Sequence, residues 1–157
     1  HQTTSLMMEV MQKEEKFIRD HKVLDMGCGT GILAILAAKM KSATPVHAID
    51  IDPTAVFSVR ENAWKNRVHE KIDSRCGDAS LIQAAKYDII LANINRNILL
   101  QDMATYTRGL LPGGVLVISG FYTQDLQMLT EEASRCGLEY EYHLEKENWV
   151  AAKFTKK

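Results

Sequence analysis

The sequence predicts an α/β fold with a doubly wound, mostly parallel, seven-stranded sheet, a C-terminal antiparallel strand and helices on both faces. Apolar runs alternate five times with stretches of helical spacing, which is typical of a parallel sheet covered by helices. The first four runs are each followed by a glycine loop or a polar residue, where such sheets bind ligands. The last two runs are too close for a crossover helix and are expected to pair antiparallel.

The first half of the chain alternates helices and strands around one glycine loop. Apolar residues recur at helical spacing from Leu6 to Ile18, and one of the hydroxyl residues at 3–5 is expected to cap this helix. Asp52 followed by Pro53 predicts a helix N-cap with proline at the first helical position. The expected elements of this half are the helices 6–18, 32–40 and 53–66 and the strands 23–25, 46–51 and 71–76.

The second half continues the alternation and ends in two strands. The segment 87–92 is a clear buried strand, and the LLPGG sequence at 110–114 is expected to stop the preceding helix sharply. Gly137 is expected at the C′ position of the last helix. The expected elements of this half are the strands 87–92, 115–119, 138–144 and 149–154 and the helices 98–111 and 124–135.

Composition and charge argue against several classes of protein. The chain is 46% hydrophobic and 25% charged, and its net charge of −1 gives no electrostatic reason to bind nucleic acid or an anionic membrane. No apolar run approaches the roughly 18 residues that span a bilayer. The three cysteines form no C-x-x-C pair, and the five histidines have no metal-ligand spacing. We therefore expect a cytoplasmic monomer with no metal site and no direct contact with nucleic acid or membrane.

The segment 25–31 (DMGCGTG) lies between an expected strand and an expected helix. Gly27 and Gly29 let the backbone turn tightly and approach a ligand, and free N–H groups at the start of the helix favour a carboxylate. The spacing is G-x-G-x-G, since Ile32 stands where a dinucleotide fingerprint has its third glycine. Asp25 would repel a pyrophosphate and suits a ligand with an ammonium group. The alternative interpretation is a tight structural turn.

Polar residues follow the next three strands, at the same edge of the expected sheet. Asp50 ends the second strand, 23 residues after Gly27, and can accept hydrogen bonds from both hydroxyls of a ribose. Asp52 could compete for this role, but the proline after it assigns it to the helix cap. Asp78 could accept a hydrogen bond from an adenine amino group or serve as a turn residue. Asn93 could hold a cofactor, an incoming nucleophile or both, unless it is an ordinary turn asparagine.

Seven segments spread over the chain occur together in one known family. They are HQTT at 1–4, DMGCGTGILAI at 25–35, AIDIDP at 48–53, ENA at 61–63, LANI at 91–94, LPGG at 111–114 and ENWV at 147–150. With these segments the chain resembles the catalytic domain of the PrmA family. The resemblance covers nearly the whole chain. It implies a Rossmann-like class I methyltransferase that methylates amino groups of one large-subunit ribosomal protein with S-adenosylmethionine.

The resemblance also implies roles for particular residues. Thr4 of H-x-T-T is expected near the methionine part of S-adenosylmethionine, with Gly27 as the first loop glycine, Asp50 at the ribose and Asn93 at the fourth strand. The implied reaction is direct displacement at a methyl group, and alignment of the reactants can lower its barrier by roughly 7–11 kcal/mol. Desolvation favours the neutral amine, so no general base is expected. Asn93, with the backbone around Ile94, is expected to orient the amine as the catalytic residue.

Two departures from the family pattern concern the substrate. Family members usually carry a glycine-rich segment before H-x-T-T and an N-terminal domain that recognises the ribosomal protein. Residues 1–157 are therefore expected to be a methyltransferase domain, a fragment that lacks the recognition domain. Small residues commonly follow A-N-I in the family, whereas Asn95, Arg96 and Asn97 stand here, at a lip expected to face the incoming amine.

Alternative functions remain open on the sequence alone. The chain could methylate another substrate, or it could be an NAD-dependent oxidoreductase with the same order of strand, glycine loop and acid. It could also be a binding module that holds the cofactor without catalysis. The missing third glycine and the carboxylate of Asp25 argue against the oxidoreductase. S-adenosylmethionine is the expected cofactor, and a ribosomal protein of the large subunit is the expected partner.

Overall fold

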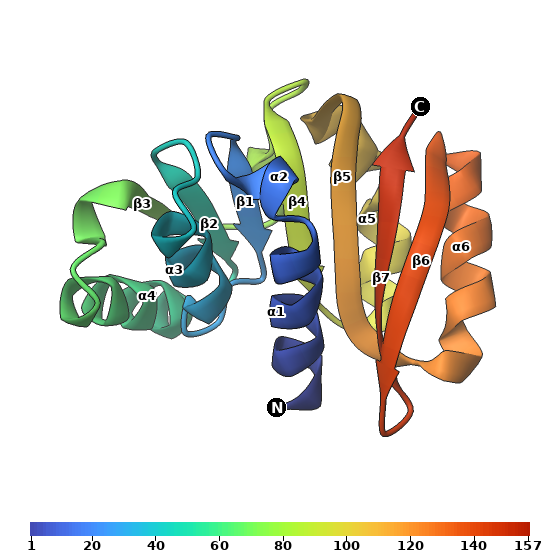
Figure 1. Cartoon of the computed structure of the whole chain (residues 1–157), viewed down its shortest axis with the longest axis horizontal. Helices are drawn as coiled ribbons and strands as arrows, with labels where there is room; N and C mark the ends of the chain where they lie inside the picture. The colour runs from blue at the N-terminus through green and yellow to red at the C-terminus, as the bar shows by residue number, and fades with distance from the viewer.

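The computed structural model describes all 157 residues, and a single sheet forms its centre (Figure 1). The strands are β1 (Val23–Met26), β2 (Val46–Asp50), β3 (Ile72–Cys76), β4 (Tyr87–Asn93), β5 (Leu110–Tyr122), β6 (Leu138–Lys146) and β7 (Trp149–Lys156). They are arranged in the order β3-β2-β1-β4-β5-β7-β6, and β7 runs antiparallel to both of its neighbours. The other neighbouring strands are parallel, so the expected sheet is confirmed.

Helices cover both faces of this sheet. They are α1 (Gln2–Lys13), α2 (Glu15–Ile18), α3 (Ile32–Lys39), α4 (Pro53–Lys65), α5 (Arg96–Gly109) and α6 (Leu126–Arg135), with three short 3₁₀ turns, η1 (His69–Lys71), η2 (Ala79–Leu81) and η3 (Thr123–Asp125). Successive residues of a strand point to opposite faces. Thus Ile89 and Leu91 of β4 pack with α1–α4, whereas Ile90 and Ala92 pack with α5 and α6. Figure 1 shows α1 and α3 in front of the sheet and α5 behind it.

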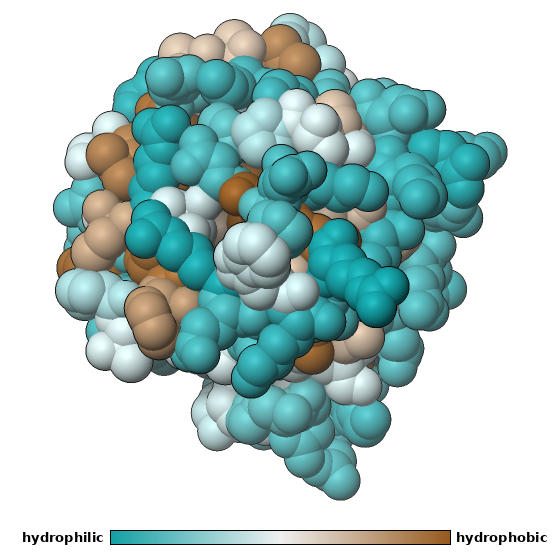
Figure 2. Space-filling model, turned by 90° about the vertical axis from the view of Figure 1, so that its left-hand side faces the viewer, coloured by the Kyte–Doolittle hydropathy of each residue, from teal (hydrophilic) through white to brown (hydrophobic).

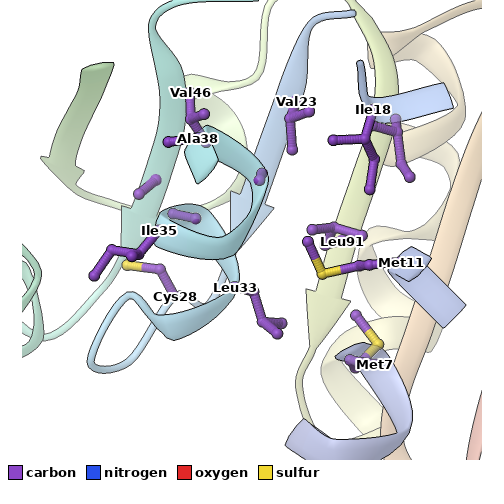
Figure 3. Packing of buried hydrophobic residues seen from close by; sticks show 14 of the residues in the cluster. Met7, Met11, Ile18, Val23, Cys28, Leu33, Ile35, Ala38, Val46 and Leu91 are labelled. Atoms are coloured by element: carbon purple, nitrogen blue, oxygen red, sulfur yellow. The ribbon is translucent and has the colours of Figure 1, made fainter. Parts of the chain in front are cut away.

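The first helix is part of the core. Met7 and Met11 of α1 are fully buried and lie close to Leu91 of β4, with Leu33 of α3 beside them (Figure 3). Burying one such side chain contributes about 1.5–3 kcal/mol. This packing fixes α1, and with it the residues at the start of the chain, over the middle of the sheet.

The first helix begins and ends differently from the expectation. His1 is its N-cap, because its Nδ1 accepts the Thr3 N–H at 3.2 Å, so the expected cap by one of residues 3–5 is wrong. Those residues form the first turn instead. The helix also ends before Glu14, whose side chain binds Lys153 at 2.6 Å, and the short α2 follows. Apolar spacing reports neither the His1 cap nor the contact of Glu14 with Lys153.

Other local signals are confirmed, and the largest shift of an expected boundary among them lies between α5 and β5. Asp52 caps α4 by accepting the Thr54 N–H at 2.9 Å, and Gly137 follows α6 with a φ of +87°. α5 ends and β5 begins at Leu110, so the 110–114 sequence lies inside the strand. The expected helix to residue 111 and the expected strand start at 115 are therefore wrong by a few residues.

The edge strand β3 is protected by charge. Asp73 and Arg75 form an ion pair of 3.0 Å on it, and charged side chains discourage pairing with another strand. Figure 2 shows this end of the molecule as mostly hydrophilic with separate apolar patches. Phe57 and Trp64 of α4 are exposed. None of the helices is both long enough and apolar enough to pass through a bilayer.

Candidate functional site

A cleft of about 390 Å³ opens at the carboxyl ends of β1, β2, β3 and β4. Four of the residues singled out in the sequence line it, namely Gly27, Asp50, Asp78 and Asn93. They come from four different strand ends, and the parallel order of these strands brings those ends to one edge of the sheet. The expected convergence of these four residues is confirmed.

The glycine loop after β1 needs its glycines for different reasons. Gly27, Gly29 and Gly31 have φ values of +73°, +54° and +85°, which side chains rarely adopt. A Cβ on Gly27 would lie 2.7 Å from Cγ1 of Ile94, so the loop packs directly on the loop after β4. A Cβ on Gly29 would meet nothing within 4 Å, and this exposed residue does not line the cleft.

Asp50 is held by the backbone of two loops. Its Oδ2 accepts the Gly29 N–H at 3.0 Å, and its Oδ1 accepts the Asp52 N–H at 2.9 Å. Each carboxylate oxygen has further acceptor capacity. The carboxylate therefore has a fixed direction in the cleft and can still receive two hydroxyl donors.

Asp25 lies directly under the glycine loop and is almost fully buried. Its Oδ2 accepts the Ala34 N–H at 3.1 Å, whereas its Oδ1 has no hydrogen-bond partner. Burial raises the pKa of Asp25 to about 7; the Ala34 hydrogen bond opposes this shift, and the charge of Asp50 adds to it. A buried acceptor without a partner is costly, so a donor or cation bound at this loop would be stabilised.

The start of α1 reaches the cleft through Thr3. Asn93 Nδ2 donates to Thr3 Oγ1 at 3.3 Å, and this hydroxyl lies 3.1 Å from His1 Nδ1. Thr3 is buried, whereas Thr4 is partly exposed and does not line the cleft. The H-x-T-T segment is therefore near the site as expected, but Thr3 is the threonine that contacts Asn93. The cofactor contact assigned to Thr4 stays a prediction.

Asp78 is a turn residue, which was one of the two interpretations of its position in the sequence. Its Oδ1 accepts from both the N–H and the hydroxyl of Ser80, at 2.9 and 2.5 Å, and thereby caps η2. These two hydrogen bonds lower the pKa of Asp78. The residue also lines the cleft, so a contact with an adenine amino group stays a prediction beside the confirmed cap.

Several residues of the cleft were not identified from the sequence. Ile51 and Ile98 line it and expose 74% and 39% of their surface. Gln101 and Asp102 follow Ile98 at helical spacing on the same face of α5. Burial raises the pKa of Asp102, Gln101 opposes the shift, and the charge of Asp78 adds to it.

A second hollow of about 370 Å³ lies beside the loop that follows β4, and we call it the aromatic hollow. It is lined by Asn95, Arg96, Asn97, Gly120, Phe121, Tyr122, Asp125 and Trp149. The centroids of the Tyr122 and Trp149 rings are 4.1 Å apart, and the centroid of the His1 ring lies 5.2 Å from that of Trp149. His1 thus joins the hollow to Thr3 and Asn93 in the cleft.

The chain matches known proteins over its full length. The family model described as ribosomal protein L11 methyltransferase (PrmA) matches residues 1–157. A ribosomal protein L11 methyltransferase of Porphyromonas gingivalis is 50% identical over 99% of this chain and 52% of that protein, and one of Phocaeicola vulgatus is 45% identical over 100% and 55%. The chain therefore spans about half the length of these curated relatives.

Solved structures agree with this match. The ribosomal protein L11 methylase of Lactobacillus delbrueckii subsp. bulgaricus is 26% identical, with a TM-score of 0.91 over 100% of this chain and 80% of that one. A putative S-adenosylmethionine dependent methyltransferase of Listeria monocytogenes is 12% identical with a TM-score of 0.79 over 98% of this chain and 99% of that one, which shows a shared fold. The chain belongs to the ribosomal protein L11 methyltransferase (PrmA) family.

Proposed function

We propose that this chain binds S-adenosylmethionine in the cleft and transfers its methyl group to amino groups of ribosomal protein L11. The observation that carries the proposal is the fixed carboxylate of Asp50 above the glycine loop, together with the unpartnered Oδ1 of buried Asp25. The Asp50 carboxylate can accept hydrogen bonds from the ribose hydroxyls, and the Asp25 carboxyl group suits an ammonium group. The names of the curated relatives support ribosomal protein L11 as the acceptor.

The residues of the cleft fit the parts of this cofactor. Asp50 would hold the ribose hydroxyls, and Gly27, which lines the cleft, would lie against the methionine part. Thr4 and Asn93 would hold that part from the other side. The expected contact of Asp78 with the adenine is supported by its position in the lining, where exposed Ile51 and Ile98 offer apolar surface to a flat ring.

The chemistry divides between the cofactor and the protein. S-adenosylmethionine supplies a methyl group activated by a sulfonium. The protein aligns the attacking nitrogen, and such alignment can contribute roughly 7–11 kcal/mol. Asn93 would orient the amine, since Thr3 accepts one of its amide hydrogens and leaves the carbonyl oxygen as an acceptor. Burial lowers the pKa of an amine, so the neutral nucleophile can form without a dedicated base.

One of the alternatives, the NAD-dependent oxidoreductase, is weaker than this proposal. A pyrophosphate-bearing dinucleotide would meet the carboxylates of Asp25 and Asp50 beside the glycine loop. Membership of the PrmA family also gives the oxidoreductase no support. A module that binds the cofactor without catalysis shares the same cleft, and methyl transfer distinguishes it from an enzyme.

The proposal is tested by binding and by transfer. S-adenosylhomocysteine at 100 times its Kd should stabilise the protein by about 2.7 kcal/mol, whereas NAD should have no effect. Labelled methyl groups should then appear on ribosomal protein L11, and mass spectrometry should place them on amines. Stabilisation without any methyl transfer would identify a binding module instead.

Asn93→Ala tests the role of the amide. Loss of a hydrogen bond to a charged or reacting group costs about 1.5–3 kcal/mol, so methylation should slow by about 10–100-fold. Asn66→Ala is the matched control, because Asn66 caps the distant end of α4 and bonds Lys39. Full cofactor affinity and full rate in Asn93→Ala would show that this assignment is wrong.

A further inference from the structure

Arg96 and Asp125 form an ion pair at the rim of the aromatic hollow, with Nη1 and Oδ1 3.0 Å apart. We propose that Arg96 is a positioning residue for the methyl acceptor. It acts through Asp125 to hold the wall of the aromatic hollow, and the hollow receives an alkylamine, such as a lysine side chain, on its way to Asn93. This inference rests on the proposed methyltransferase function and extends it to the acceptor side.

The ion pair joins two elements that meet only in the folded chain. The Arg96 guanidinium also donates from Nε to Asn97 Oδ1 at 3.2 Å, at the start of α5. The second oxygen of Asp125 accepts the Tyr122 N–H at 3.2 Å, where β5 ends. One carboxylate therefore ties the first turn of α5 to the backbone of Tyr122, and the Tyr122 ring is a wall of the hollow.

The burial of the pair favours a fixed geometry. The Asp125 side chain is 10% exposed and the Arg96 side chain 43% exposed, so the carboxylate is shielded from water while the guanidinium forms the rim. A shielded carboxylate with two donors is held more rigidly than a surface ion pair. Loss of Arg96 would leave Asp125 with only the backbone donor of Tyr122.

The charges of the rim suit an amine that must react in its neutral form. Arg96 and Asp125 are the two charged side chains of the lining, and their charges cancel. The hollow thus presents neither a free carboxylate, which would hold the acceptor as ammonium, nor a free cation, which would repel it. Tyr122 and Trp149 offer aromatic faces to the alkyl chain.

The floor of the hollow lies against the loop that follows β4. Gly120 has a φ of +100°, and a Cβ on it would lie 2.9 Å from the carbonyl carbon of Ile94. Ile94 N–H donates to Ser119 O at 3.1 Å, so the two loops are in backbone contact. Asn93 directly precedes Ile94, which puts the entrance for the acceptor next to the residue proposed to orient it.

Steady-state kinetics with ribosomal protein L11 and labelled S-adenosylmethionine test the inference. Arg96→Met should raise KM for L11 about tenfold, with kcat and the Kd for S-adenosylhomocysteine unchanged within about twofold, because binding of the acceptor is lost and binding of the cofactor is not. Arg96→Lys should give an intermediate KM. Arg135→Met is the matched control, since Arg135 forms an exposed ion pair with Glu132 on α6.

Tryptophan fluorescence supplies a readout that needs no methyl transfer. The chain has two tryptophans, so Trp64→Phe leaves Trp149 as the reporter of the hollow. Titration with L11 in the presence of S-adenosylhomocysteine should change Trp149 emission, and Arg96→Met should shift the midpoint about tenfold to higher L11.

Three results would overturn the inference while leaving the proposed function intact. The first two are an unchanged KM in Arg96→Met and an equal weakening of acceptor and cofactor binding. An unchanged Trp149 emission in a protein that methylates L11 would also place the acceptor elsewhere. A wild-type protein that binds S-adenosylhomocysteine and methylates nothing would contradict the proposed function itself, and the inference with it.

Discussion

At the scale of single residues, Asp25 combines a structural cost with a proposed role in ligand binding. Its carboxyl group is buried with one oxygen unpartnered, and its pKa is raised to about 7 by that burial. In the unfolded chain the ordinary value is 3.8. The folded state therefore binds this proton more tightly, and the stability that the proton contributes is lost as the pH rises from about 4 towards 7 and above.

Asp25→Asn should remove this pH dependence. Since one pKa unit corresponds to about 1.4 kcal/mol, the wild-type protein should lose about 2–3 kcal/mol relative to the variant between pH 5 and pH 8. Urea unfolding of both proteins at the two pH values measures the difference. The variant should also bind S-adenosylhomocysteine about tenfold more weakly at pH 8, because it lacks the charge for the ammonium group. Equal changes in both proteins would mean that Asp25 titrates at its ordinary pKa.

At the scale of elements, the site depends on how closely the loops after β1, β4 and β5 approach one another. Gly27 packs on the Ile94 side chain, and Gly120 packs on the Ile94 backbone. A side chain can move aside, but a strand-end backbone held by the Ser119 hydrogen bond cannot do so readily. The contact at Gly120 therefore tolerates an added side chain less well than the contact at Gly27.

Gly120→Ala should destabilise the protein by about 2–3 kcal/mol, because the added methyl group meets backbone and φ is positive. Gly113→Ala is the control in the same strand. Its φ is +80°, but a Cβ there meets nothing within 4 Å, so only the backbone strain of about 1 kcal/mol should appear. Chemical denaturation of the two variants measures the difference, and equal losses would mean that the close approach to Ile94 carries no cost.

At the scale of the whole molecule, the two ends of the chain hold each other in place. Glu14, after α1, binds Lys153 of β7 at 2.6 Å and accepts the Tyr142 hydroxyl of β6 at 2.7 Å. The carboxylate and ammonium side chains are 10% and 12% exposed. This buried pair holds α1 against the C-terminal hairpin of β6 and β7. The first turn of α1 carries Thr3, which contacts Asn93.

Glu14→Gln should cost about 3 kcal/mol or more, because it leaves the Lys153 cation buried without a counter-charge. Glu15→Gln, the neighbouring substitution, removes an ion pair with Arg19 in which both side chains are more than half exposed. That change should stay within about 0.5 kcal/mol. Unfolding midpoints in urea compare the two, and a small effect in both would show that packing of α1 alone holds it.

Local patterns were sufficient for most of the fold. Buried apolar runs locate the strands, and Asp52 and Gly137 mark helix ends through their own backbone interactions. The patterns failed to predict the end of α1 and the start of β5, where residues distant in sequence are in contact. α1 ends before Glu14, whose side chain binds Lys153, and β5 begins at Leu110, which pairs with Tyr87 of the neighbouring strand.

The candidate site also has features that the sequence predicts and features that only the tertiary structure shows. The glycine loop, Asp50 and Asn93 were identifiable from sequence, because parallel strands bring their carboxyl ends to one edge. The contact of Thr3 with Asn93, the shifted pKa of Asp25 and the pairing of Arg96 with Asp125 were decided by tertiary structure. Backbone conformation is set by neighbours along the chain, whereas burial and side-chain pairing depend on which distant residues the packed helices and strands bring together.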